Sequence, residues 1–438
     1  MLKAVKFGGS SVAGAAQFQK VREIVRSDPA RRVVVASAAG KRFSGDHKLT
    51  DLLYLCHAHL TYGVSCEEIL SEIEGRFVEI RDTLGLTMDV ESEFAALRAR
   101  LDRSFPVDAL VSRGEAFTSR LLAEYLGYTY VDAADCVFFS PDGRIDRQKT
   151  DEAIRRAAEA YGTIVIPGFY GSLPSGKLKV MSRGGSDITG ALAAAALGAE
   201  VYENWTDVSG ILMADPKIVK DPSPIRRITY NELRELAFLG ASVLHEEAVL
   251  PVKERGIPLN IRNTNAPDDP GTMILQTVPE EERDQDRFIT GVAGRRDFTI
   301  LTLRKRELNT AAALRQALAV LERYRIPLEH ISLGLDSFGL VVSSGALGEE
   351  LYAVVGELQQ ACAAEDVQVQ EGIALIAAVG RKMPFRPGVS GKLFRALGDQ
   401  GINIRTIAQG ADELSIIVGV EEHDFEQAIR VLYHGFAG

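Results

Sequence analysis

The chain begins with a short apolar strand that leads directly into a loop of two glycines and two serines. Residues 3–12 read KAVKFGGSSV, and apolar residues then recur at helical spacing from Phe18 to Val25. A second strand is expected at residues 32–36. Glycines let backbone N–H groups approach an anion, a following helix adds partial positive charge, and Lys6 supplies a full charge. This order predicts an α/β fold with a phosphate-binding loop, and it makes a nucleotide-using enzyme the first hypothesis.

Composition excludes several classes of protein. The chain has 438 residues, of which 46% are hydrophobic and 25% charged, and its formal net charge is −10. This balance is typical of a globular protein of two or three domains. The acidic charge argues against nucleic-acid binding. The sequence has neither an N-terminal targeting signal nor an apolar run of about 18 residues, so we expect a cytoplasmic protein that does not contact a membrane.

The four cysteines give no sign of a disulfide framework or a metal site. They lie at positions 56, 66, 136 and 362, without a Cys-x-x-Cys pair. Cys56, His57 and His59 fall within one expected helix, residues 50–60, but they do not share a face of it. We therefore expect no metal ligands from the protein itself.

Residues 1–275 alternate between strand-like and helix-like segments. The expected helices include residues 116–126, 187–197 and 231–239, the last opened by a capping box at 229–232. Such alternation predicts a mostly parallel central sheet covered by helices. The expected strands are residues 4–7, 32–36, 109–111, 129–131, 164–167, 201–204 and 258–261.

The C-terminal part contains an internal repeat. Residues 325–338 align with 401–414, an offset of 76, and the same offset places 300–303 on 376–379. Each copy predicts a strand, a helix, two strands and a second helix, so we expect two βαββα units. The polar segment 278–287 that precedes them is expected to be a linker.

One glycine-rich segment imitates a nucleotide-binding motif. Residues 171–177, GSLPSGK, match most of the P-loop pattern, but Leu178 stands where a Mg²⁺-binding hydroxyl is needed. A strand-like segment then follows where the P-loop requires a helix. A turn between two strands therefore explains this segment better.

Three further loops carry charged side chains. They read MSRGGSD at 181–187, SRGE at 112–115 and WTDVSG at 205–210, the last followed by ADPK at 214–217. We expect all of them to follow strands of one α/β sheet, where ligands usually bind. An Arg suits a carboxylate and acidic groups suit an ammonium, so Arg183 with Glu115 and Asp187 fits an amino acid. Asp187 could instead be a simple helix cap.

Together these motifs resemble the signatures of the aspartokinase family, which has the amino-acid-kinase fold and phosphorylates the β-carboxylate of aspartate. KFGGSS from Lys6, SRGE, SRGGSD and WTD occur here in the family's order over nearly the whole chain, and RPGV at 386–389 resembles an ACT domain. The resemblance implies a three-layer sandwich with a mostly parallel sheet at residues 1–280. A first ACT unit would follow at 289–370 and a second at 371–438, with 289–293 as a candidate strand that completes the second.

The resemblance implies ATP-dependent phosphorylation of L-aspartate to 4-phospho-L-aspartate, the first step toward lysine, threonine and methionine. Lys6 and Asp187 would be catalytic, and Mg²⁺ would arrive bound to ATP. Glu115 would hold the α-ammonium of aspartate and Arg183 its α-carboxylate. The remaining site residues would be Ser37, Thr50 and Asp187 for aspartate, and Gly8, Gly9, Ser10, Thr206, Asp207 and Lys217 for the phosphates and nucleotide.

The resemblance also implies feedback by an end-product amino acid, with lysine as the first choice and threonine as the second. The ACT units would join chains into a homodimer or a dimer of dimers. The effector would contact residues of the first unit, namely Asn309, Thr310, Ala313, Leu328, Glu329, Ser332 and Asp336. A solvated edge charge is the alternative interpretation of Glu329.

Two positions depart from the family pattern. Ser242 stands where many members have a nucleotide-contacting lysine, and Leu212 stands where many have a tyrosine. Two other functions remain as alternatives: a kinase for glutamate or acetylglutamate, and a catalytically weak amino-acid sensor.

Overall fold

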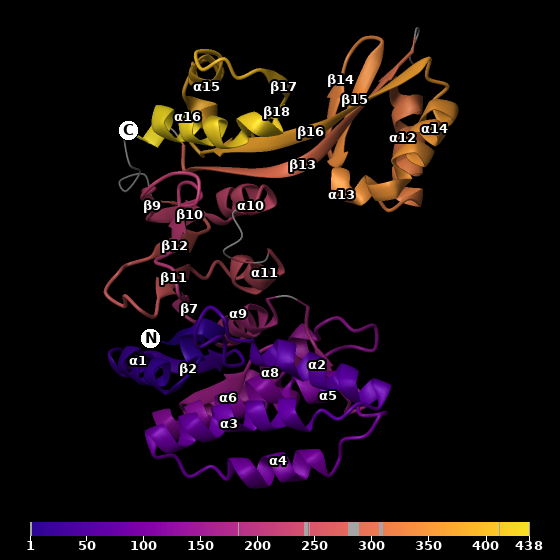
Figure 1. The fold of residues 1–438 in the computed structure, drawn as a ribbon. Helices are drawn as coiled ribbons and strands as arrows, with labels where there is room; N and C mark the ends of the chain where they lie inside the picture. Colours follow the sequence, from indigo (N-terminus) through magenta and orange to yellow (C-terminus); the bar gives the residue numbers. More distant parts are fainter. Residues whose placement is uncertain are drawn as a thin grey trace. The chain divides into compact units, whose positions relative to one another are not determined.

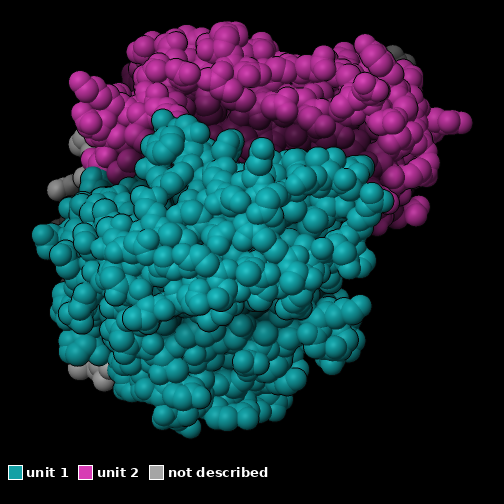
Figure 2. Space-filling model, turned by 60° about the horizontal axis from the view of Figure 1, so that its bottom comes forward, with its two compact units in different colours: residues 1–211, 224–230, 243–280 teal, residues 212–223, 231–242, 281–438 magenta. Residues whose placement is uncertain are grey.

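The chain folds into two compact units (Figures 1 and 2). The computed structural model describes residues 2–182, 184–240, 244, 246–278, 289–305, 310–410 and 412–437. Unit 1 comprises residues 1–211, 224–230 and 243–280, and unit 2 comprises 212–223, 231–242 and 281–438. Two segments that the sequence assigned to the N-terminal domain, 212–223 and 231–242, thus group with unit 2. The predicted linker lies, from residue 279 onward, outside the described residues.

Unit 1 is built around one eight-stranded sheet. Its strands, in spatial order, are β10 (Arg227–Thr229), β12 (Thr272–Leu275), β11 (Leu259–Asn263), β7 (Val201–Thr206), β1 (Lys3–Phe7), β2 (Arg31–Ala36), β4 (Ile164–Pro167) and β3 (Thr129–Tyr130). All neighbours run parallel except β11 and β12. The carboxyl ends of β7, β1, β2 and β4 therefore meet at one edge, as the alternation of elements predicts.

Helices cover both faces of this sheet. α1 (Ala15–Arg26), α2 (Leu49–Tyr62), α3 (Glu67–Leu84) and α6 (Arg113–Leu126) share one hydrophobic core with Val5 and Phe7 of β1. α9 (Gly185–Leu197) packs against β1, β2 and β7, and α8 (Arg147–Tyr161) and α11 (Glu246–Glu254) pack against α9. Unit 1 is thus the three-layer sandwich that the family resemblance implies.

Shorter elements complete unit 1. They are η1 (Gly9–Val12), α4 (Val90–Arg98), α5 (Val107–Val111), α7 (Ala133–Cys136), β5 (Tyr170–Ser172), β6 (Leu178–Val180), β9 (Pro224–Ile225) and, at the boundary with unit 2, β8 (Ile211–Leu212). Among the described residues of the chain, no helix is both long and apolar enough to cross a membrane.

One expected strand is wrong. Residues 109–111 belong to the helix α5, and Ser112 alone separates α5 from α6, whose first turn holds the rest of the SRGE segment. Leu110 and Val111 are fully buried in that helix. A run of three apolar residues looks the same in a buried strand and in a buried helical turn, so the pattern could not separate them. The other strands expected in unit 1 are present, with ends shifted by at most two residues.

The segment that imitates a P-loop is a hairpin turn, as predicted. β5 and β6 pair antiparallel on either side of it. The backbone N–H of Leu173 donates to the carbonyl of Lys177 over 2.9 Å. Gly176 has a φ of 78°, a left-handed conformation that glycine adopts without a steric cost.

A buried ion pair fastens Glu203 of β7 to Arg31, the first residue of β2. Arg31 Nε lies 2.8 Å from Glu203 Oε2, and these side chains are only 6% and 2% exposed. The same carboxylate oxygen accepts the indole N–H of Trp205 over 2.9 Å. The pair thus ties the strand that leads into the WTD motif to the neighbouring part of the sheet.

Replacing Glu203 with glutamine is expected to lower the free energy of unfolding of unit 1 by about 3 kcal/mol, because Arg31 would keep its buried charge without a counter-charge. Glu200→Gln is the matched control, since Glu200 is exposed just before the same strand. Urea denaturation of both variants measures the difference. A loss below about 1 kcal/mol for Glu203→Gln would show that the pair contributes little.

Unit 2 contains the two predicted repeats in one six-stranded antiparallel sheet. Its strands, in spatial order, are β14 (Leu328–Leu333), β15 (Ser337–Ser343), β13 (Gly291–Arg304), β16 (Asp366–Val379), β18 (Ser415–Glu421) and β17 (Ile404–Gln409). β14 and β17 begin and end at positions related by the offset of 76 found in the sequence.

Each copy of the repeat adds two main helices to this sheet. They are α12 (Thr310–Arg323) and α14 (Leu351–Ala361) in the first copy, and α15 (Val389–Gly398) and α16 (Phe425–Ala437) in the second. The shorter elements are α13 (Ser344–Leu347), η3 (Gly348–Glu350), η4 (Met383–Phe385), η5 (Glu422–Asp424) and α10 (Tyr230–Phe238), of which residues 231–238 belong to unit 2. Both copies thus have the βαββα order expected from the sequence.

The long strands β13 and β16 link the two copies. Residues 298–304 of β13 pair with 366–373 of β16, and residues 291–295 pair with 375–379. The first half of β13, which includes residues 291–293, therefore lies beside the half of β16 that pairs with β18 of the second copy.

Candidate active site

A cavity of about 700 Å³ opens at the carboxyl edge of the unit 1 sheet. This volume is within the usual range for a small-molecule site. The residues that line it come from the segments after β1, β2, β4 and β7 and from the first turns of α2, α6 and α9. They are Lys6, Gly9, Ser10, Ser37, Ala38, Ala39, Gly40, Lys41, Phe43, Ser44, Lys48, Thr50, Glu115, Phe169, Gly184, Gly185, Ser186, Asp187 and Asp207.

The glycine-rich loop after β1 is held by backbone contacts on both sides. The N–H of Gly8 donates to the carbonyl of Trp205 over 2.9 Å, and the N–H of Gly40 donates to the carbonyl of Gly9 over 2.8 Å. The 3-10 helix η1 begins within this loop at Gly9, and the α-helix α1 begins only at Ala15. The helix that the sequence placed directly after the loop is thus preceded by this short 3-10 turn.

Gly40→Ala is expected to raise the KM for ATP, the nucleotide that the family resemblance implies, at least about tenfold, because displacing a positioning loop by about 1 Å is costly. A Cβ at Gly40 would lie 2.6 Å from the carbonyl carbon of Gly9 and 2.8 Å from the N atom of Ser10, so the loop would have to move. Gly14→Ala is the matched control, because a Cβ there meets nothing within 4 Å. Steady-state kinetics with varied ATP tests the prediction, and equal KM values for the two variants would contradict it.

Lys6 and Asp187 form a close ion pair inside the cavity. The Lys6 Nζ atom lies 2.6 Å from Asp187 Oδ1, with the lysine side chain 9% exposed. The cap position of α9 is taken by Gly184, so the alternative interpretation of Asp187 as the helix cap is not supported. Asn204 on β7 donates its Nδ2–H to the same Oδ1 atom over 2.9 Å. The structure thus joins side chains from three elements around one carboxylate oxygen.

Glu115 brings into the cavity a buried carboxyl group that has no counter-charge among the described residues. The residue is 4% exposed and belongs to the first turn of α6. Within the described part of the chain, its Oε2 atom has no hydrogen-bond partner. Burial raises the pKa of Glu115 to about 8, although a backbone hydrogen bond with Ala38 acts in the opposite direction. Such a group binds a cation readily, because a cation supplies the missing counter-charge.

The structure brings together most of the residues that the sequence predicted for this site. Lys6, Gly9, Ser10, Ser37, Thr50, Glu115, Asp187 and Asp207 all line the cavity. Gly8 and Thr206 do not line the cavity themselves, but they are the chain neighbours of Gly9 and Asp207, which do. Lys217 is an exposed residue of unit 2, and Arg183 lies outside the described residues, so the substrate contacts of these two residues stay predictions. Ser242, which stands where many family members have a lysine, also lies outside the described residues.

Of the loop between β2 and α2, sequence reasoning named only Ser37 and missed the rest as a wall of the cavity. This loop contributes Lys41, Phe43, Ser44 and Lys48. Its signal in the sequence is weak, because a polar stretch without periodicity is typical of any surface loop. Asn204 was also missed: it is the last residue of the expected strand 201–204, and ligand candidates were taken only from the WTDVSG segment that follows that strand.

The base of that loop is fastened by one carboxylate between two arginines. Asp46 Oδ2 accepts from Arg42 Nε over 3.0 Å, and its Oδ1 accepts from Arg76 Nη2 over 2.7 Å. The hydrogen bond from Arg42 holds the pKa of Asp46 far below its usual value. The loop therefore has a fixed base beneath Lys41, Phe43 and Ser44.

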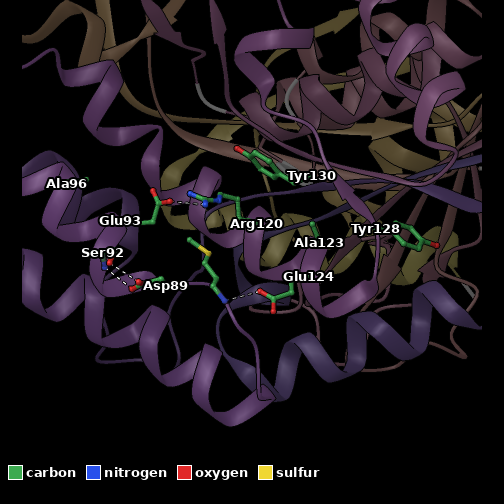
Figure 3. A pocket seen from close by; sticks show the side chains of 10 residues that line it. Asp89, Ser92, Glu93, Ala96, Arg120, Ala123, Glu124, Tyr128 and Tyr130 are labelled. Atoms are coloured by element: carbon green, nitrogen blue, oxygen red, sulfur yellow. Dashed lines mark hydrogen bonds and ion pairs between the residues drawn. The ribbon is translucent and has the colours of Figure 1, made fainter.

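A second cavity, of about 570 Å³, lies between α4 and α6 (Figure 3). Each of its charged groups already has a partner. Glu93 pairs with Arg120 over 2.9 Å, Asp89 accepts from Ser92, and Glu124 accepts the backbone N–H of Met88. The unsatisfied carboxylate at Glu115 makes the first cavity the stronger candidate.

The expected effector residues lie in the first repeat of unit 2. Glu329 on β14 pairs with Arg295 over 2.8 Å, and its side chain is 9% exposed, so the edge charge is neither fully solvated nor unpaired. Ala313 is buried in the core of this repeat. Asn309 and the side chain of Thr310 lie outside the described residues. An effector role for this set stays a prediction.

Comparisons with known proteins agree with this fold and site. Residues 1–263 match the amino acid kinase family, and residues 376–436 match an ACT domain. The fold, the site and these matches define an amino acid kinase that carries a C-terminal ACT domain.

Named relatives narrow the class. Aspartokinase 3 of Bacillus subtilis is 34% identical, over 99% of this chain and 98% of that protein. The structure of Clostridium acetobutylicum aspartate kinase is 41% identical and covers 99% of both chains, with a TM-score of 0.90. E. coli aspartokinase III, 27% identical over 100% of both chains, was solved with aspartate and ADP (TM-score 0.77) and with lysine and aspartate (TM-score 0.73). This chain belongs to the aspartokinase family, and its activity is that of an aspartate kinase.

Proposed function

We propose that the cavity of unit 1 aligns the γ-phosphoryl group of ATP with the β-carboxylate of L-aspartate, giving 4-phospho-L-aspartate and ADP. The observation that carries this proposal is the buried Lys6 ammonium, which lines the cavity together with Gly9 and Ser10 of the glycine-rich loop. An ammonium in this position faces the region where phosphates would be held by backbone N–H groups.

The chemistry needs positioning and charge compensation more than proton transfer. The β-carboxylate of aspartate ordinarily has a pKa near ~3.9, so it is already an anion at pH 7 and needs no general base. The barrier comes from bringing this anion against a phosphoryl group that is itself negative. Lys6 offsets that repulsion in a site of low effective dielectric, where a fixed charge acts strongly.

The opposite wall of the cavity fits an amino acid. The free Oε2 atom of Glu115 would accept the α-ammonium of aspartate, while Ser37 and Thr50 would supply hydroxyl groups. Arg183 would bind the α-carboxylate, and Asp187 would help to orient the substrate. Aspartate would thus lie between Glu115 and Lys6.

The nucleotide would be held by Gly8, Gly9, Ser10, Thr206, Asp207 and Lys217. Mg²⁺ would enter bound to ATP and neutralise part of the phosphate charge. The hydroxyl of Ser10 and the carboxylate of Asp207 line the cavity with oxygen atoms, which suit a hydrated Mg²⁺ carried by the phosphates.

Unit 2 would sense an end-product amino acid, with lysine as the first choice and threonine as the second. The E. coli relative crystallised with lysine supports lysine. The paired ACT-like repeats support assembly into a homodimer or dimer of dimers. A cytoplasmic location stays a prediction from the sequence.

ADP release with ATP, Mg²⁺ and aspartate tests the proposed reaction, and glutamate and acetylglutamate serve as competing substrates. We expect turnover with aspartate and none with glutamate or acetylglutamate. Turnover with glutamate instead would reassign the substrate, and aspartate binding without turnover would favour the amino-acid sensor.

The same assay tests the effector. Lysine is expected to lower the initial rate at fixed aspartate, and threonine to act less. Inhibition by threonine alone would overturn the choice of lysine.

A further inference from the structure

The strand register places Asn204 beside Lys6 on one face of the sheet. Lys6 of β1 is paired with Asn204 of β7 in a parallel ladder, where paired residues point to the same side. Asn204 is only 5% exposed. Its Oδ1 atom accepts from Lys6 Nζ over 3.4 Å, and its Nδ2 donates to Asp187 Oδ1 over 2.9 Å. One neutral amide therefore touches both charged members of the Lys6–Asp187 pair.

We propose that Asn204 is a positioning residue that aims the Lys6 ammonium at the transferring phosphoryl group. This inference rests on the proposed function of Lys6. The ammonium has three N–H donors. Among the described residues, the acceptors within its reach are Asp187 and Asn204, so the third N–H points to the cavity that Lys6 lines.

A neutral amide is suited to this task for two reasons. By donating to Asp187 Oδ1, the amide of Asn204 holds the carboxylate in one rotamer. Lys6 and Asn204 then share this oxygen atom, which would otherwise accept from Lys6 alone. Because it carries no charge, it orients Lys6 without cancelling its positive charge. A carboxylate at this position would surround the ammonium with two negative charges, and an aliphatic side chain would leave Asp187 free to rotate.

The variants Asn204→Asp and Asn204→Leu separate these two effects. Both are expected to lower kcat by about 10- to 100-fold, because a misplaced charge no longer meets the phosphoryl group. The KM for aspartate should stay within about threefold of wild type, since the aspartate ammonium is bound by Glu115. Asn204→Asp should also weaken a non-hydrolysable ATP analogue at least tenfold while ADP binding changes less than threefold, because only the triphosphate reaches Lys6.

Asn260→Asp is the matched control. Asn260 is a buried asparagine of the neighbouring strand β11, in register with Glu203. Successive residues of a strand alternate between faces, so Asn260 lies on the face opposite Asn204. This control should leave kcat within about threefold, and thermal melting compares the folding of all variants.

The outcomes distinguish the inference from the function on which it rests. If the wild-type enzyme showed no aspartate-dependent turnover, the proposed function would be refuted. The role of Asn204 would still be tested by comparing how Asn204→Asp binds the non-hydrolysable ATP analogue and ADP. Folded Asn204 variants with wild-type kcat and wild-type selectivity for triphosphate over diphosphate would overturn the inference. A rise in the KM for aspartate with unchanged kcat would also overturn it.

Discussion

Replacing Lys6 with alanine is expected to lower kcat about a thousandfold, while the affinity for aspartate stays within a few-fold. Two unit charges 4 Å apart interact by about 4 kcal/mol at an effective dielectric constant of about 20, which corresponds to roughly three orders of magnitude in rate. Lys6 is only 7% exposed, so little water can reach the site to stabilise the phosphates in place of the lost ammonium. Asp187 would also lose its ion-pair partner and would add a negative charge beside the phosphates.

Single-turnover kinetics with saturating ATP measures the chemical step, and calorimetry measures aspartate binding. Lys3→Ala is the matched control, because Lys3 belongs to the same strand but pairs with Asp28 and Glu203 instead of Asp187. A loss of only a few-fold in kcat would refute the catalytic role of Lys6.

Glu115→Gln is expected to raise the KM for aspartate by at least about 30-fold, because removing one partner of a buried charge pair costs about 2–5 kcal/mol. In the wild-type protein, burial raises the pKa of Glu115 to about 8. At pH 7 the free enzyme therefore holds a proton on Glu115, and the ammonium of aspartate must displace it. We expect about one proton to be released for each aspartate bound at pH 7, and none at pH 9.

Calorimetry in buffers with different ionisation enthalpies measures this proton release. Glu124→Gln is the matched control, since Glu124 is an exposed acid of the same helix. Aspartate affinity that does not change between pH 6 and pH 8 would contradict the role of Glu115 as the ammonium ligand.

The same substitution should stabilise the ligand-free protein at alkaline pH. Because the folded-state pKa of Glu115 is raised from its usual value of 4.5 to about 8, folded protein keeps a proton that the unfolded chain releases. The contribution of Glu115 to stability is therefore largest below pH 4.5 and is lost as the pH rises to 8. Glu115→Gln cannot ionise, so above pH 8 it should be more stable than wild type by roughly 3–5 kcal/mol.

Thermal melting of both proteins at pH 6 and pH 9 checks this expectation. A variant that melts at a higher temperature at pH 9 yet no longer binds aspartate would show that Glu115 serves binding at the expense of stability. Equal melting temperatures at pH 9 would mean that the ligand-free site compensates the buried charge in another way.

The order of elements could be predicted because it depends on local patterns. Strands of unit 1 were recognised from short apolar runs, and the repeat of unit 2 was found because an offset of 76 relates the same residue types in both copies. The failure at residues 109–111 has the same origin: three apolar residues carry too little periodicity to separate a strand from a helix such as α5.

The pairing of site residues could be predicted only in part. The motifs identified Lys6, Glu115 and Asp187, because each is an unusual charge beside glycines or at the start of a helix. The bond between Lys6 and Asn204, which are 198 residues apart, depends on β1 and β7 being neighbours in the sheet. Strand order is set by crossover connections and by the packing of helices on both faces, and a local pattern contains neither.

By itself, then, the sequence determined the class of fold, the two repeats and the charged groups of an amino-acid phosphorylating site, because these follow from residue type and spacing. Only the tertiary structure decided that Asp187 pairs with Lys6 instead of capping α9, that Glu115 is buried with one oxygen unpaired, and that Asn204 touches both members of the ion pair. Burial and pairing are properties of the surroundings, and these surroundings come from segments far apart in the chain.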